Sequence, residues 1–183
     1  MRIISGDMKG RQIRSIEGLR TRPTSDKVKG AIFNTLRDKV CGASVLDLFA
    51  GTGNMALEAL SRGSRKAVLV DKSREAQLII RKNIEITGVV DRASLIRSDA
   101  LRYISRYGGE SFDLIFLDPP YREGLVSKTL ALLREKACLT ANGVIVAETA
   151  GDETIEGDLY PFEIRKTGNY GDTKVWYIQR SDT

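Results

Sequence analysis

The fold is decided by residues 45–56, which read Val45-Leu46-Asp47-Leu48-Phe49-Ala50-Gly51-Thr52-Gly53-Asn54-Met55-Ala56. A short apolar run leads into two glycines and then into residues of helical character, so the stretch predicts a buried strand, a tight turn and a helix. Gly51 and Gly53 let the backbone approach a ligand closely, and Ala56 completes a G-x-G-x-x-A pattern that lets the helix pack against a sheet. The stretch is typical of a site for a nucleotide-type cofactor.

Beyond this turn, short apolar runs alternate with amphipathic stretches. We predict strands buried on both faces over residues 45–49, 67–70, 94–97, 114–117 and 144–147. Helices are predicted between them, over residues 54–62, 73–87, 100–106 and 123–136. Repeated strand and helix imply a parallel sheet with right-handed crossovers and helices on both faces, which is a doubly wound, Rossmann-like α/β fold. Ligands of such sheets bind at the carboxyl ends of the strands.

The N-terminal segment departs from this alternation. Residues 2–4 and 11–14 predict a small hairpin, and a helix follows that Thr24, Ser25 or Asp26 can cap. We therefore divide the chain into a hairpin-helix extension, residues 1–40, and a main domain, residues 41–183.

At the other end, the extended runs 162–166 and 174–179 are joined by residues 168–171, Gly-Asn-Tyr-Gly. Glycine and asparagine between two extended runs are turn signals. These residues predict a terminal antiparallel hairpin.

Composition narrows the classes of function. The chain has 183 residues, 42% of them hydrophobic and 29% charged, which is the balance of a soluble globular protein. No apolar run approaches the roughly 20 residues that span a bilayer, so we expect a cytoplasmic protein without a membrane segment. The two cysteines, Cys41 and Cys138, are far apart in sequence, and histidine is absent. These features argue against a disulfide framework, a metal site and a hydrolase triad.

Charge is concentrated at the N-terminus. Residues 1–40 contain ten basic and four acidic side chains, a net of +6, whereas residues 41–183 contain nineteen basic and twenty acidic ones, a net of −1. A basic segment on a near-neutral body is typical of a protein that binds a polyanion such as RNA. The alternative is a solvated surface without a ligand.

Two acidic residues follow predicted strands at positions suited to a cofactor. Asp71 lies twenty residues after Gly51, where a carboxylate can accept the hydroxyls of a ribose. Asp99 follows the third strand and can accept the amino group of an adenine. The structural alternative for each residue is a helix cap, since Asp is favoured there.

The motif that discriminates among functions is Asp118-Pro119-Pro120-Tyr121, directly after the fourth strand. The prolines fix the backbone and lack amide donors, so nearby carbonyl oxygens are left to accept hydrogen bonds. An exocyclic amine of a base could donate to the Asp118 carboxylate and the Pro119 carbonyl, which directs its lone pair at a methyl donor. Tyr121 can stack on the base. A packed proline loop is the structural alternative.

These residues carry a family resemblance. The loop resembles the (D/N)PPY motif of methyltransferases that act on exocyclic amino groups of nucleic acids. Further stretches resemble the bacterial RsmD family of 16S ribosomal RNA guanine-N2 methyltransferases: residues 1–6, 9–11, 22–28, 33–36, 46–53, 57–63 and 170–173. Asn54-Met55-Ala56 and Asp71 depart from that family's usual residues.

The resemblance implies a class I methyltransferase sheet of seven strands with the last antiparallel, S-adenosylmethionine as cofactor, and guanine N2 of 16S ribosomal RNA as substrate. It implies catalytic roles for Asp118, Pro119, Pro120 and Tyr121. The implied cofactor contacts are Asp47, Phe49, Ala50, Gly51, Gly53, Asp71, Lys72, Asp99, Ala100 and Asp118. The expected contacts to substrate are Lys9, Arg11, Arg22, Thr24 and Tyr121. We expect a monomer that acts on 16S RNA, alone or within a 30S subunit or assembly intermediate.

Other functions compete with this interpretation. An NAD-dependent oxidoreductase would use the glycine turn and Asp71 but not the Asp118–Tyr121 loop. A noncatalytic RNA-binding protein would use the basic segment and leave the cofactor features without a role. A methyltransferase acting on adenine N6 or cytosine N4, in DNA or RNA, would use the same loop.

Overall fold

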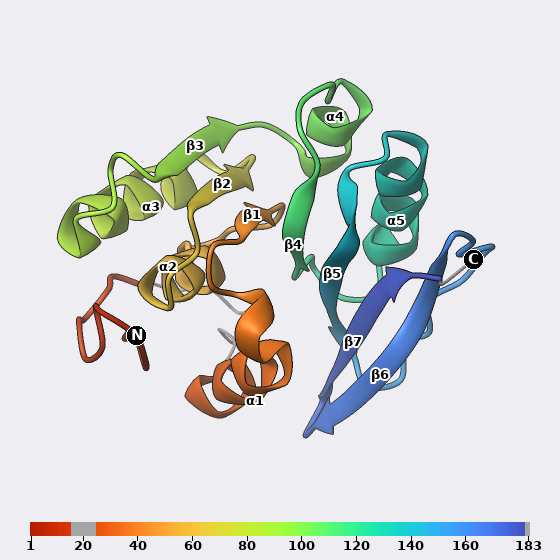
Figure 1. Cartoon of the computed structure of the whole chain (residues 1–183), viewed down its shortest axis with the longest axis horizontal. Coiled ribbons are helices and arrows are strands. Elements are labelled where there is room, and N and C mark those ends of the chain that lie inside the picture. The colour runs from red at the N-terminus through yellow and green to blue at the C-terminus, as the bar shows by residue number, and fades with distance from the viewer. Residues whose placement is uncertain (16–24, 182–183) are drawn as a thin grey trace.

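The computed structural model describes residues 1–15 and 25–181 (Figure 1). The helices are α1 Asp26–Leu36, α2 Asn54–Ser61, α3 Arg74–Thr87, α4 Ala100–Ser105 and α5 Leu125–Glu135, with a 3-10 turn at Arg37–Lys39. The strands are β1 Ser44–Asp47, β2 Lys66–Asp71, β3 Ala93–Arg97, β4 Phe112–Leu117, β5 Leu139–Ala150, β6 Phe162–Tyr170 and β7 Thr173–Arg180. Among these helices, none is long and apolar enough to cross a membrane.

The strands form one mixed sheet of seven in the order β3-β2-β1-β4-β5-β7-β6. Strands β1 to β5 pair in parallel, and β7 runs antiparallel to both of its neighbours. The predicted doubly wound α/β sheet with an antiparallel last strand is confirmed. Strand order reverses between β1 and β4, and such a reversal opens a crevice at the carboxyl ends of the strands.

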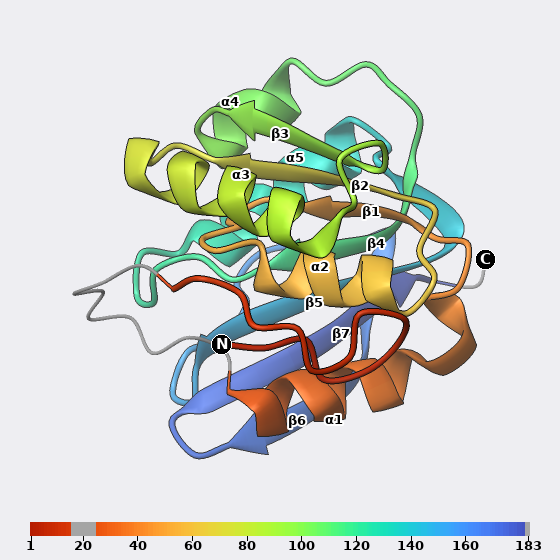
Figure 2. The same ribbon diagram turned by 90° about the vertical axis from the view of Figure 1, so that its left-hand side faces the viewer.

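Two apolar layers cover the sheet, one on each face (Figure 2). The first contains buried side chains of α1, α2 and α3, and the second contains those of α4 and α5. Ile3, Met8 and Ile13 of the N-terminal segment belong to the first layer. The described part of the N-terminal extension therefore shares the core of the main domain.

The N-terminal hairpin is reduced to one antiparallel bridge, Arg2 with Gln12. Its loop lies against the C-terminal end of α2, because the amide of Asp7 donates to the Ser61 carbonyl at 2.9 Å. Gly6 has a φ of +79°, and a Cβ built on it would lie 1.9 Å from that same carbonyl oxygen. Only glycine allows so close an approach of the two backbones.

A buried lysine joins this segment to the main domain. Lys29 of α1 is fully buried, and its Nζ lies 3.1 Å from Glu58 Oε2. The same Nζ donates to the Arg2 carbonyl and to Asn54 Oδ1, both at 2.7 Å. Lys29 is one of the ten basic residues of the N-terminal segment. Because it is buried and paired with Glu58, its charge is not available to a polyanion.

Glu58 of α2 is the partner that completes this network, and it too is fully buried. Its two carboxylate oxygens accept the amides of Ile4 and Ser5 at 2.9 and 3.0 Å. Arg62 lies one turn along α2 and pairs with Glu58 Oε1 at 2.9 Å. Charge and hydrogen bonds on every side offset the cost of burying both ions.

The predicted connection of the terminal hairpin is wrong in position. Gly168, Asn169 and Tyr170 continue the β6 ladder opposite β7, and the turn falls at Gly171 and Asp172. Gly171 has a φ of +60°, which the tight turn requires, whereas Gly168 does not have a positive φ. The glycine and asparagine turn signals therefore begin before the chain reverses.

We predict that Glu58→Gln lowers the free energy of unfolding by about 3 kcal/mol, because it leaves the Lys29 charge buried without an anionic partner. Urea denaturation would measure the loss. Glu110→Gln is the matched control, since Glu110 makes the same kind of ion pair with Lys66 on the surface and should leave stability nearly unchanged. Equal losses in the two variants would contradict a special role for the buried pair.

Candidate active site

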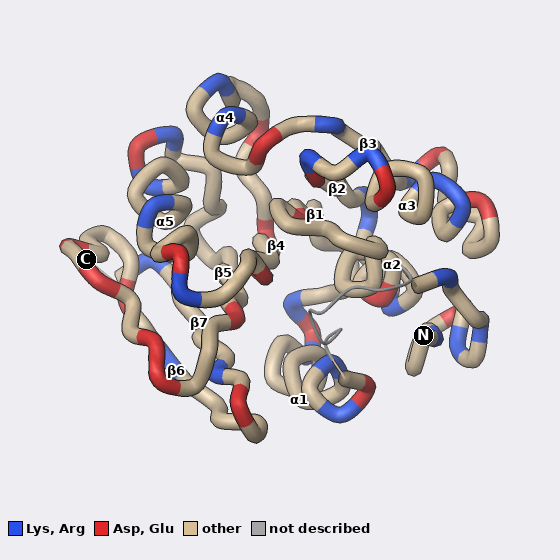
Figure 3. Tube along the Cα trace, turned by 180° about the vertical axis from the view of Figure 1, so that it is seen from behind, with Lys and Arg blue, Asp and Glu red and all other residues tan. Residues whose placement is uncertain are grey.

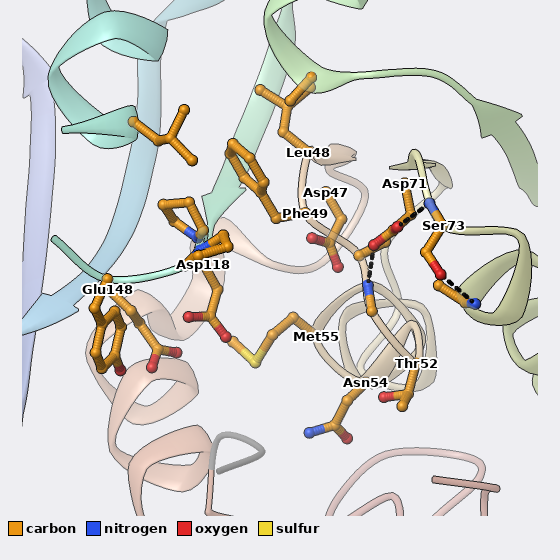
Figure 4. A pocket seen from close by; sticks show the side chains of 18 of the residues that line it. Asp47, Leu48, Phe49, Thr52, Asn54, Met55, Asp71, Ser73, Asp118 and Glu148 are labelled. Atoms are coloured by element: carbon orange, nitrogen blue, oxygen red, sulfur yellow. Dashed lines mark hydrogen bonds between the residues drawn. The ribbon is translucent and has the colours of Figure 1, made fainter. Parts of the chain in front are cut away.

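A pocket of about 940 Å³ opens at the carboxyl ends of the parallel strands (Figure 4). Residues that follow β1, β2, β3 and β4 line it, together with Glu148 of β5 and the β6–β7 turn. The volume falls within the range of roughly 300 to 1,000 Å³ that is typical of pockets for small molecules and cofactors. The pocket lies at the point between β1 and β4 where the strand order reverses.

The glycine turn is held by backbone bonds and by one carboxylate. The Gly51 amide donates to Asp71 Oδ2 at 2.9 Å, which ties the β1 turn to the end of β2. Gly53, with a φ of +80°, precedes α2, and a Cβ there would lie 3.1 Å from a Leu69 methyl group. Asn83 of α3 is fully buried and donates to the Thr52 carbonyl at 2.9 Å. The turn is thus fixed in shape before any ligand binds.

Asp71 and Asp99 each receive backbone hydrogen bonds. Asp71 Oδ1 accepts the Ser73 amide at 2.8 Å, and Ser73, not Asp71, caps α3 (Figure 4). Asp99 caps α4 by accepting the Arg102 amide at 3.1 Å. A carboxylate offers about four acceptor positions, so each residue can still accept a hydrogen bond from a ligand in the pocket.

The loop after β4 borders the same pocket. Asp118 and Pro119 lie at its wall, with Pro119 buried and Asp118 partly buried. The hydroxyl groups of Tyr121 and Thr173 lie 3.1 Å apart, which joins the loop to the start of β7. Burial raises the pKa of Tyr121, and the nearby negative charges of Asp118 and Glu148 add to this effect. Tyr121 is therefore neutral at physiological pH.

Asp47 ends β1 beneath the glycine turn, and the pKa of its carboxyl group is strongly raised. Its side chain is 3% exposed, and burial raises its pKa to about 8. The negative charge of Asp118 contributes in the same direction, while the amides of Ala56 and Phe49 oppose it. An acid buried beside other acids favours a cation in the pocket, because a positive charge would stabilise its ionised form.

Comparison with known proteins gives the chain its family. The family model described as conserved hypothetical protein 95 matches residues 1–179. Ribosomal RNA small subunit methyltransferase D of Escherichia coli is 34% identical over 149 residues, which cover 81% of this chain and 74% of that protein. The chain belongs to the RsmD family.

Two further proteins, both described as methyltransferases, match almost the whole chain. YlbH of Bacillus subtilis is 37% identical over 177 residues, which cover 96% of both proteins. The solved structure of YhhF from Escherichia coli is 30% identical, covers 98% of this chain and 97% of its own, and superposes with a TM-score of 0.88. The sheet and its helices therefore have the class I methyltransferase arrangement.

The pocket brings together most of the residues that the RsmD resemblance implied. The predicted cofactor and catalytic residues that line it are Asp47, Phe49, Ala50, Gly51, Asp71, Lys72, Asp99, Ala100, Asp118, Pro119, Pro120 and Tyr121. Gly53 does not line the pocket and instead shapes the turn.

The predicted substrate residues are placed differently. Lys9 is exposed in the loop beside the far end of α2, and Arg11 donates to the Ile86 carbonyl near the end of α3 at 2.9 Å. Neither lines the pocket. Arg22 and Thr24 lie outside the described residues.

Some pocket residues were not predicted. Glu148 lines the pocket and is 5% exposed. Met55, at the start of α2, extends toward Asp118 (Figure 4). Tyr170 and Thr173 flank the β6–β7 turn at the pocket. Their stretch carried part of the RsmD resemblance, which is the signal that could have assigned them to the site.

We predict that Asp47 makes stability fall as pH rises. Between its ordinary pKa of 3.8 and about 8, the folded state holds a proton that the unfolded state has lost, so the free energy of unfolding decreases by at most about 1.4 kcal/mol per pH unit. Asp47→Asn should flatten this dependence in urea titrations between pH 5 and 8. Asp38→Asn, at an exposed carboxylate, is the control and should preserve the slope. Identical slopes for Asp47→Asn and the unmodified protein would refute the assignment.

Proposed function

We propose that the chain transfers a methyl group from S-adenosylmethionine to the exocyclic N2 amine of a guanine in 16S ribosomal RNA. The observation that carries the proposal is the Asp118–Tyr121 loop, which borders a pocket shared with the glycine turn. Free RNA, a 30S subunit or an assembly intermediate would serve as substrate, and we expect the enzyme to act as a cytoplasmic monomer.

The residues at the carboxyl ends of β1, β2 and β3 fit S-adenosylmethionine. Asp71 would accept the ribose hydroxyls and Asp99 the adenine amine, because each retains acceptor positions that face the pocket. Asp47 lies beneath the turn, where its carboxylate favours the cationic methionine portion of the cofactor. When bound, S-adenosylmethionine supplies an electrophilic methyl group, so no covalent intermediate with the protein is needed.

The loop after β4 would then orient the amine. The amine lone pair of a base is delocalised into the ring, which makes the nitrogen a weak nucleophile. Asp118 and the Pro119 carbonyl would accept its two N–H groups and direct the lone pair out of the base plane. As the nitrogen is methylated it must lose a proton, which the Asp118 carboxylate would accept and pass to water. Tyr121, neutral and at the pocket wall, would stack on the base.

An NAD-dependent oxidoreductase would also use the glycine turn and Asp71, but the membership of this chain in the RsmD family argues against that function. That function gives the Asp118–Tyr121 loop no task. The acidic pocket also suits a cationic cofactor better than the two phosphates of a dinucleotide. Calorimetry with each cofactor separates the two functions, since NAD binding without S-adenosylmethionine binding would contradict the proposal.

We predict that two substitutions in the pocket affect different quantities, one the methylation rate and the other the cofactor affinity. Asp118→Ala should lower the methylation rate by about 100-fold or more, with cofactor affinity largely retained, because it removes an acceptor that acts on the amine. Asp71→Ala should raise the dissociation constant of S-adenosylmethionine more than it alters that of the RNA. Methylation rates and calorimetry measure the two quantities. An unchanged rate in Asp118→Ala would eliminate the orienting role.

The methylated nucleotide can be located by mass mapping of 16S RNA from cells that lack the gene. The proposal expects one guanine to lose a methyl group. Restoring the gene should restore it, whereas a gene that carries Asp118→Ala should not.

We predict that Lys9 and Arg11 contribute RNA affinity away from the pocket. Lysine and arginine residues are spread over several elements, the N-terminal segment among them (Figure 3). Lys9→Ala with Arg11→Ala should weaken RNA binding and reduce its salt slope by about one unit for each lost phosphate contact. Lys128→Ala with Arg106→Ala is the control, since these exposed residues lie with α5 and α4 on the opposite face. Equal slopes for both pairs would indicate that the N-terminal charges are only solvated.

A further inference from the structure

Asn54 is the first residue of α2, and it lines the pocket although it is only 7% exposed. Its side-chain oxygen accepts a hydrogen bond from Lys29 Nζ at 2.7 Å. Within the described part of the chain, its Nδ2 donates to no protein group. A largely buried amide nitrogen needs a hydrogen-bond acceptor when the pocket fills and water is displaced. The ligand that occupies this part of the pocket is expected to supply that acceptor.

Lys29 fixes which end of the Asn54 amide faces the pocket. Its Nζ has three acceptors: the Arg2 carbonyl and Asn54 Oδ1, both at 2.7 Å, and Glu58 Oε2 at 3.1 Å. Burial lowers the pKa of Lys29, but the Glu58 carboxylate opposes this shift, and three acceptors match the three N–H groups of the charged ammonium. An ammonium offers no acceptor, so turning the amide over would set N–H groups against N–H groups. The oxygen of Asn54 therefore stays on Lys29, and its NH2 group is held as a donor to the pocket.

The surroundings of Asn54 favour an anionic acceptor. The N-terminus of a helix carries a partial positive charge, and Asn54 begins α2. A hydrogen bond from a cation polarises an amide, so the Lys29 ammonium makes the N–H groups of Asn54 stronger donors. Lys27 of α1 is exposed and lines the same pocket. Figure 4 shows the Met55 side chain between Asn54 and the Asp118 carboxylate, so the amide and that carboxylate face different parts of the pocket.

We propose that Asn54 binds the carboxylate of the methionine portion of S-adenosylmethionine through its side-chain NH2 group. This inference rests on the proposed function and adds a cofactor-binding residue to it. The methionine portion carries two cationic groups, the sulfonium and the ammonium, which suit the acidic residues that line the pocket. Its carboxylate is the one anionic group of the cofactor, so it requires N–H donors instead. Asn54 would supply such donors beside the glycine turn, directly after Gly53.

The test compares two cofactors that differ only in this carboxylate. S-adenosylmethionine and its decarboxylated form are titrated by calorimetry into the unmodified protein and two variants, and the ratio of the two dissociation constants is taken for each protein. Asn54→Ala should shift the ratio against S-adenosylmethionine by about tenfold or more, the loss expected for a hydrogen bond to a charged group. Asn54→Asp should shift it further in the same direction. Aspartate keeps an acceptor for Lys29 but turns a negative oxygen toward the pocket.

Both cofactors are measured on one preparation, so the ratio does not depend on the folded fraction and a partly unfolded variant remains informative. Asn142→Ala removes an exposed asparagine of β5 and should keep the ratio of the unmodified protein. An unchanged ratio in both Asn54 variants would overturn the role of Asn54, and weaker RNA binding in the same variants would assign the residue to the substrate. Failure of the unmodified protein to bind either cofactor would instead reject the proposed function.

Discussion

The parallel register of the three central strands is the constraint on which the site depends. Asp47 at the end of β1 is paired with Phe116 of β4, and Leu117 of β4 is paired with Ala147 of β5. Backbone hydrogen bonds fix these pairs, so Asp47, Asp118 and Glu148 meet at one edge regardless of their side chains. Burial raises the pKa of Asp47, and the negative charge of the neighbouring Asp118 raises it further. A cationic ligand would relieve that repulsion, which is how the fold couples its own electrostatics to a sulfonium cofactor.

A second constraint, a buried ion pair, holds the start of α2 beside the glycine turn. The buried Lys29–Glu58 pair connects α1, α2 and the start of the chain, while the Lys29 Nζ also reaches Asn54 at the beginning of α2. Because Asn54 follows directly after Gly53, the ion pair and the glycine turn share one helix N-terminus. The described N-terminal residues are thus part of the scaffold that holds the turn, in addition to any contact that they make with RNA.

The main elements could be predicted because their signals are local. Apolar runs identified the five parallel strands, although β3 lies at the edge of the sheet with exposed residues and is not buried on both faces as predicted. The glycine spacing with Asp71 located the pocket at the edge where the structure has it. Features that depend on distant partners could not be predicted. Lys29 counted as surface charge until the fold placed Glu58 against it. Glu148, which follows the predicted strand 144–147, received no role from the sequence, since only the sheet order shows that β5 is the neighbour of β4.

The placement of charge also explains how an acidic pocket can serve a polyanionic substrate. The phosphates of RNA would be repelled by the acidic residues that line the pocket, Asp118 and Glu148 among them, whereas a neutral base with exposed N–H groups would not. A base inside a helix cannot reach such a pocket, so the target must be unstacked and turned away from its phosphates. Basic side chains at a distance from the pocket, such as Lys9 beside the far end of α2, can hold the backbone while the base enters. The residues that bind the RNA backbone are therefore separate from those that bind the base. Phosphates require cationic side chains, whereas the N–H groups of the base require hydrogen-bond acceptors.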